Sequence, residues 1–247
     1  MPSEAPSNGP EPSFPPGFLP GSRSARAPER AIKPGRHGLS AAEVAEIQRE
    51  RILDAFVAVT AQEGYSSLTI SKITDAAGVT KKAFYVYFTD IEDCFLAAYE
   101  YGTGKVMVLM TEAYDAAPTW VEGIRAGLRV LLKVLAAERP FARTAIVEVY
   151  AAGPRLRAAR NAFLAGFRAF FTDPEYALPD TPKTVIDAIV GGIHDTLYLT
   201  IEEDRTEELP DLLPSLTYFA LLPLLGRDEA LEQLEITGPH AAQRQAP

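Results

Sequence analysis

Residues 68–88 constrain the fold most strongly, because they carry the pattern of two short helices joined by a tight turn. Ile70, Ile73 and Ala77 recur at intervals of three and then four residues, which places them on one face of a helix. Gly78 follows, and glycine takes the left-handed conformation that commonly ends a helix without steric cost. This spacing predicts a helix-turn-helix.

The second helix of this pattern has an apolar inner side and a polar outer side. Thr80 is its expected N-cap, and Phe84 and Phe88 point inward together with Val79. Basic residues at a helix start, with phenols beyond them, suit the major groove, where such side chains reach base edges and phosphates. The alternative is an ordinary helix pair with a solvated basic face. The predicted DNA contacts are Thr69, Ser71, Thr80, Lys81, Lys82, Ala83, Tyr85 and Tyr87.

The same region resembles a known family. The residues that carry the resemblance are Gly64-Tyr65, Leu68-Thr69, Ile73, Ala76 to Thr80, Phe84-Tyr85, Phe88 and Glu92-Asp93. Over about residues 41–101 they are similar to the N-terminal domain of tetracycline-repressor (TetR) family transcriptional regulators. The resemblance implies a homodimer that binds a palindromic operator and responds to a small molecule. Thr74 replaces the usual alanine, and Ile91 stands where a phosphate-binding lysine is common.

Charge is unevenly distributed along the 247 residues. Residues 22–90 carry ten Lys and Arg against eight Asp and Glu, whereas residues 91–247 carry fourteen against twenty-three. The helix-turn-helix end is therefore the end that favours phosphate, and the acidic remainder does not. Residues 1–36 are rich in Pro, Ser and Gly, which predicts a disordered tail. Its basic part, with Arg23, Arg26, Arg30, Lys33 and Arg36, is either an arm that binds the minor groove or a soluble linker.

The rest of the chain reads as helices. Ser40 and Glu43 form a capping-box pattern that opens a helix ending near Gly64, and Asp90 is the expected cap of a long helix interrupted near Gly102 and Gly104. Further helices are predicted over 119–137, 141–152, 155–171, 184–201 and 211–225. No run alternates with period two for long enough to form a sheet. The fold class is therefore all-α.

The last two of these helices are apolar around much of their circumference. A helix of this kind must be covered on more than one side. Burial within the monomer would satisfy this requirement, but the resemblance implies instead that 184–201 and 211–225 form a four-helix dimer interface. The predicted domains are the tail 1–36, a DNA-binding domain 37–90, a ligand-binding and dimerisation domain 91–226, and a weakly ordered tail 227–247.

The chain carries no enzyme signature. Its three histidines lack metal-ligand spacing, and neither a phosphate-binding glycine loop nor a nucleophile elbow is present. We expect no catalytic residue, metal or cofactor. The single cysteine, Cys94, is expected in the core, and without a signal peptide or a long apolar run the protein is expected in the cytoplasm, not in a membrane.

The resemblance implies a pocket in the C-terminal domain, and its apolar lining suggests a hydrophobic or aromatic ligand. The candidates are Met110, Tyr114, Trp120, Glu148, Tyr150, Phe167, His194 and Tyr198. The predicted function is a TetR-like regulator, more specifically a repressor, released from its operator by a small molecule. The alternative is a helical small-molecule-binding protein that no longer reads DNA, for which Ile91 and the small positive charge of the N-terminal domain are the support.

Overall fold

The structure, a computed structural model, describes residues 19–26, 40–171 and 181–235. Within these ranges all regular elements are helices, so the predicted all-α class is confirmed. The α-helices are α1 (Ala41–Glu63), α2 (Ile70–Ala77), α3 (Lys81–Tyr87), α4 (Ile91–Asp115), α5 (Trp120–Ala137), α6 (Arg139–Ala142), α7 (Pro154–Gly166), α8 (Lys183–Glu202), α9 (Leu213–Leu225) and α10 (Arg227–Glu235). Short π or 3₁₀ turns span Tyr65–Ser67, Arg143–Val147, Glu148–Ala151, Phe167–Phe171 and Thr206–Leu212.

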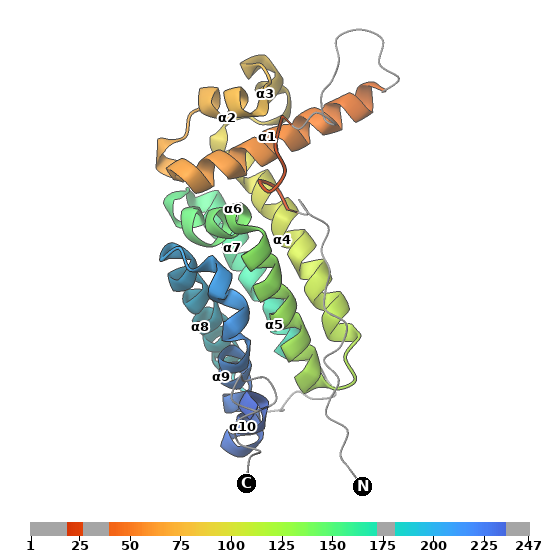
Figure 1. The fold of residues 1–247 in the computed structure, drawn as a ribbon, viewed down its shortest axis with the longest axis vertical. Coiled ribbons are helices and arrows are strands. Elements are labelled where there is room, and N and C mark those ends of the chain that lie inside the picture. The colour runs from red at the N-terminus through yellow and green to blue at the C-terminus, as the bar shows by residue number, and fades with distance from the viewer. Residues whose placement is uncertain (1–18, 27–39, 172–180, 236–247) are drawn as a thin grey trace.

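The helices form a head and an elongated body (Figure 1). Helices α1 to α3 pack together as the head, and α4 leads from the head along the body. Helix α5 packs against α4 on one side and against α9 on the other, while α7 and α8 complete the bundle. Helix α10 lies at the end of the body farthest from the head (Figure 1).

Local capping explains where the helices of the head begin. Ser40 and Glu43 form both hydrogen bonds of the capping box, and Thr80 accepts a hydrogen bond from the amide of Ala83. Asp90 caps α4 in the same way through the amide of Asp93. These caps agree with the sequence prediction, because each depends on residues only three positions apart.

Gly78 has the left-handed conformation that the turn requires. Its φ is 64° and its ψ is 40°, and its amide donates to backbone carbonyls of α2. A residue with a side chain would be strained at this φ. The turn therefore sets the direction in which α3 leaves α2.

Helix α4 is continuous through Gly102 and Gly104, so the predicted interruption is wrong. A Cβ atom on Gly102 would lie 2.1 Å from the ring of Phe141, which shows that α4 and α6 approach closely at this point. Glycine weakens an isolated helix by about 1 kcal/mol, but tertiary packing outweighs a cost of this size. The close contact accounts for Gly102, whereas a Cβ on Gly104 would meet no neighbour within 4 Å.

Two stretches that composition predicts as tails have defined structure in part. Residues 19–26 lie against the head, where Leu19 is fully buried and the Gly21 amide donates to Asp54 Oδ1 at 2.9 Å. At the other end, Arg227–Glu235 forms α10, and Ala230 is buried. In each stretch a few apolar residues are buried and hold the backbone in place. They hardly change the mean composition of a polar segment, so composition alone predicts a tail. The remaining parts of both tails lie outside the described residues.

Cys94 is fully buried at the start of α4, as expected for a core thiol. Burial raises its pKa well above the ordinary value, which makes the reactive thiolate scarce. Among the described residues, no helix combines the length and apolar character needed to span a membrane. Nor does that part of the chain bring together His, Cys, Asp and Glu side chains as a metal site.

Candidate DNA interface and ligand pocket

Helix α3 presents a basic and aromatic face to solvent. Phe84 is fully buried and anchors the helix, so Lys81, Lys82 and Tyr85 on the other side are exposed. Val86 is also exposed, with 69% of its surface accessible. An exposed apolar side chain beside basic residues suits the major groove, where thymine methyl groups lie on the floor and phosphates line the edges.

The predicted DNA-contacting residues divide into two groups in the structure. The hydroxyls of Thr69 and Thr80 accept hydrogen bonds from backbone amides at the starts of α2 and α3, and Tyr87 donates to Gln48 of α1 at 3.0 Å. The two caps fix the helix starts, and the Tyr87 contact joins α3 to α1. Of the other predicted residues, Lys81, Lys82 and Tyr85 are exposed, and Ser71 and Ala83 are half-buried.

Two arginines brace the turn between α2 and α3. Arg51 of α1 donates to the Ala77 carbonyl at 2.6 Å, and Arg26 donates to the carbonyls of Asp75 and Ala76. Their positive charges also oppose the negative end of the α2 dipole. Neither role follows from the local sequence pattern, because both contacts join residues at least 26 positions apart. In the same segment, Arg23 lies 3.4 Å from the buried carboxylate of Asp54.

The body contains an apolar cavity that is partly open to solvent. The residues that line it come from α4, α5, the π turn Arg143–Val147, α7, the 3₁₀ turn Phe167–Phe171 and α8: Met110, Tyr114, Gly123, Ile124, Gly127, Leu128, Leu131, Ile146, Phe163, Leu164, Phe167, Phe170, Phe171, Val190, Ile193, His194 and Leu197. The walls are almost wholly aliphatic and aromatic, so the surroundings favour an apolar ligand.

The candidates predicted for the pocket divide evenly. Met110, Tyr114, Phe167 and His194 line the cavity. Trp120, Glu148, Tyr150 and Tyr198 are not among the lining residues. Residue type could indicate aromatic and polar candidates, but not whether each one points inward.

The four residues outside the lining have other contacts. The Trp120 indole Nε1–H donates to the Phe170 carbonyl at 2.8 Å, which holds the turn that lines one wall. The Tyr150 ring lies edge-on to both His194 and Tyr198, and 54% of its surface is accessible. The Tyr198 hydroxyl donates to Glu202 at 2.8 Å. Glu148 lies at the junction between the body and the head.

The cavity wall contains two titratable residues, Tyr114 and His194. His194 is the one whose pKa is shifted into the acidic range. Burial lowers its pKa to about 4, and the nearby positive charge of Arg160 acts in the same direction. The imidazole is therefore neutral at neutral pH and can offer one hydrogen-bond donor and one acceptor to a ligand. A neutral polar group in an apolar pocket orients a bound molecule more than it attracts one.

The structure thus combines a helix-turn-helix head with a helical body that contains an apolar cavity. Residues 52–98 match the family model described as bacterial regulatory proteins of the tetR family. The matched residues include the turn, the whole of α3 and the start of α4. The resemblance inferred from the sequence is confirmed.

Curated proteins with similar sequences are regulators. The fatty acid metabolism regulator protein of Bacillus subtilis (strain 168) is 28% identical over 117 residues, which are 47% of this chain and 60% of that protein. The HTH-type transcriptional regulator AcrR of Shigella flexneri is 35% identical over 68 residues, or 28% of this chain and 32% of that protein. Both alignments thus cover less than two thirds of the curated relatives.

Solved structures share the fold over a longer span. The fatty acid degradation regulator FadR from Bacillus halodurans superposes with a TM-score of 0.65 at 23% identity, and covers 73% of this chain and 97% of its own. FadR from Bacillus subtilis, solved in complex with stearoyl-CoA, gives a TM-score of 0.64 at 24% identity over 74% of this chain and 99% of its own. These likenesses extend the shared fold from the head to the body.

Proposed function

We propose that this protein is a transcriptional regulator that binds operator DNA through α3 and acts as a repressor. The observation that carries the proposal is the exposed face of Lys81, Lys82 and Tyr85 on a head that matches the TetR-family model. The alternative of a ligand-binding protein that does not read DNA has no comparable support. Since the relatives are regulators, we also propose that it is not an enzyme.

The DNA-bound form in this proposal is a homodimer. Helices α8 and α9 leave large apolar side chains exposed, and Leu199 and Phe219 are 47% and 42% accessible. A second copy that covers these helices would form a four-helix interface. Two-fold symmetry would then place two copies of α3 in successive major grooves, about 34 to 36 Å apart, on a palindromic site.

We further propose that the cavity binds the apolar part of a fatty-acyl ligand. The walls are apolar, and the relative from Bacillus subtilis with the same fold was solved with stearoyl-CoA. A bound ligand would lower operator affinity only if it preferred the protein in a state that binds DNA poorly. Stearoyl-CoA is therefore the first compound with which to test release.

Selection from random duplex DNA at about 150 mM salt, close to physiological ionic strength, tests the proposal. We expect an enriched inverted repeat. Binding without enrichment would indicate that the contacts are confined to phosphates, and no binding by the folded protein would refute the proposed function.

Substitution of the two lysines tests the assignment of α3. A lysine that contacts a base should cost about 1–3 kcal/mol at one operator position when changed to alanine, whereas a lysine on a phosphate should weaken all sequences alike and reduce the salt slope by about one. We expect one or the other effect from Lys81→Ala and from Lys82→Ala, measured by fluorescence anisotropy across a salt series. Lys105→Ala on α4 is the charge-matched control. Unchanged affinity in both α3 variants would contradict the assignment.

A further inference from the structure

Residues 143–150 form a short segment that contacts both the head and the wall of the cavity. A π-helical turn, Arg143–Val147, leads directly into a 3₁₀ turn, Glu148–Ala151. The π turn packs against α1 and α8, and the 3₁₀ turn packs against the Tyr65–Ser67 turn of the head. In this segment, the contacts to the head and the contacts to the body are therefore only a few residues apart.

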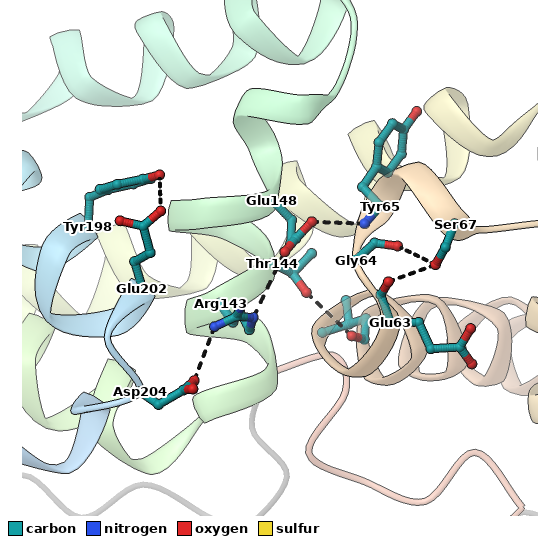
Figure 2. A network of polar contacts seen from close by, with 11 residues as sticks. Glu63, Gly64, Tyr65, Ser67, Arg143, Thr144, Glu148, Tyr198, Glu202 and Asp204 are labelled. Atoms are coloured by element: carbon teal, nitrogen blue, oxygen red, sulfur yellow. Dashed lines mark hydrogen bonds and ion pairs between the residues drawn. The ribbon is translucent and has the colours of Figure 1, made fainter.

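On the side of the head, this segment holds the C-terminal end of α1. A carboxylate oxygen of Glu148, Oε2, accepts a hydrogen bond from the Tyr65 amide at 2.8 Å (Figure 2). The Thr144 hydroxyl donates to the Val57 carbonyl of α1 at 3.3 Å. A hydrogen bond to a charged acceptor is about twice as strong as a neutral one, and only 13% of the Glu148 side chain is exposed. Glu148 is thus a strong polar link from the body to the head.

On the side of the body, the same segment reaches the cavity. Ile146, two residues before Glu148, lines the cavity, and Tyr150, two residues after it, lies with its ring centroid 6.1 Å from that of His194. Arg143 lies with its Nε 3.9 Å from Glu148 and its Nη1 3.1 Å from Asp204, just beyond α8 (Figure 2). The backbone of residues 143–150 therefore connects the cavity wall, the end of α8 and the carboxylate of Glu148.

We propose that Glu148 is a positioning residue that couples occupancy of the cavity to the orientation of the DNA-binding head. Displacement of Ile146 by a ligand shifts the short turn, and the carboxylate of Glu148 then moves the Tyr65 amide at the end of α1. Because α1 packs against both α2 and α3, the movement reaches the DNA-binding face. This inference rests on the proposed function but assigns a role to a residue that binds neither ligand nor DNA.

The first test measures coupling as the ratio of operator dissociation constants with and without stearoyl-CoA. Allosteric coupling ratios are typically about 5 to 150. We expect Glu148→Ala to bring the ratio closer to one by roughly 2- to 30-fold. Glu148→Gln keeps an oxygen acceptor for the Tyr65 amide, so it should retain more of the coupling. Glu100→Ala, an exposed carboxylate on α4, is the matched control and should behave as wild type.

The second test requires no ligand, because Leu131→Trp fills the cavity from α5. We expect this variant to change operator affinity, and we expect the change to disappear when Glu148→Ala is added. Amide exchange at Tyr65, measured by NMR, gives a direct reading of the link. Exchange should be at least about tenfold faster in Glu148→Ala than in wild type, and should differ between Leu131→Trp and wild type.

The outcomes separate this inference from the proposed function. Glu148→Ala with the coupling ratio of wild type, or an effect of Leu131→Trp that survives Glu148→Ala, would overturn the role of Glu148. Failure of wild type to bind any operator would refute the proposed function, and Tyr65 exchange would still decide the inference: unchanged exchange in Leu131→Trp would overturn it. If stearoyl-CoA does not bind, the proposed ligand is wrong. The effect of Leu131→Trp on operator affinity, with and without Glu148→Ala, then decides whether Glu148 couples the cavity to the head.

Discussion

At the scale of single residues, the most informative side chains are polar groups that are wholly or partly buried. His194 in the cavity wall is buried, whereas Glu148 at the junction and Arg51 at the turn of the head are half-buried. Loss of water makes each of them sensitive to what it contacts, because an unsatisfied polar group away from water is costly. Small changes at these positions should therefore have measurable effects on stability or on coupling.

His194 should make the stability of the protein depend on pH below neutrality. Its folded pKa is about 4, below the unfolded value of 6.5, so between these limits the unfolded state binds a proton that the folded state does not. The free energy of unfolding should fall as pH falls through this window, by at most about 1.4 kcal/mol per unit, and level off below pH 4. Above pH 6.5 this residue should contribute no pH dependence.

The comparison of wild type with His194→Gln isolates this effect from the carboxylates, which also titrate in acid. Urea unfolding at intervals from pH 4 to 7.5 should show a difference between the two proteins that grows steadily in favour of the variant as pH falls. Ile193→Val removes volume from the same wall without a titratable group, and its difference from wild type should stay constant. A constant difference for His194→Gln as well would mean that the histidine is not buried as described.

At the scale of elements, close approach between helices explains features that helix propensity alone does not. Gly102 lets α4 pass against Phe141, and Gly192 lets α8 pass against Phe219, whose ring would lie 2.7 Å from a Cβ atom at that position. Gly104, by contrast, has open space around it. Glycines that look alike in the sequence thus have different roles, depending on which face of the helix they occupy.

This difference gives a matched pair of substitutions on α4. Gly102→Ala should destabilise the protein by about 1–3 kcal/mol, because the new methyl group overlaps the Phe141 ring in a packed interior. Gly104→Ala should stabilise it by up to about 1 kcal/mol through helix propensity alone. Thermal or urea unfolding of both variants is the measurement, and Phe141→Leu in the Gly102→Ala background should recover part of the loss. Equal effects from both glycines would contradict the close contact.

At the scale of the whole molecule, charge and apolar surface are separated. In the sequence, residues 22–90 carry ten Lys and Arg against eight Asp and Glu, whereas residues 91–247 carry fourteen against twenty-three. DNA should therefore approach from the head, while the body repels it. Helices α8 and α9 belong to the body and not to the head (Figure 1). A dimer contact through their exposed apolar side chains would therefore leave the α3 helices free.

Dimerisation through these helices predicts the effect of a charge placed on the exposed face. Leu199→Glu should shift the protein toward the monomer, because an unpaired carboxylate would have to be buried in the interface. Sedimentation velocity over a concentration series would detect the shift, and operator affinity should fall with it. Val108→Glu, on an exposed position of α4, is the control. A dimer unaffected by Leu199→Glu would place the contact elsewhere.

The sequence by itself determined the local structure. The caps at Ser40, Thr80 and Asp90, and the left-handed turn at Gly78, follow from residues within a few positions of one another. Helical periodicity then indicates which residues face inward, as with Phe84. Such features depend on short-range hydrogen bonding and spacing, so they could be predicted before any packing was known.

Only the tertiary structure decided which residues share a site. Tyr150 and Phe167 are both aromatic candidates on helical turns, yet Phe167 lines the cavity and Tyr150 lies outside it. Arg26 reaches the end of α2 from 49 residues away, and Glu148 reaches Tyr65 across 83. Many helix arrangements satisfy the same apolar pattern, so contacts across such separations are determined by how whole helices pack against one another.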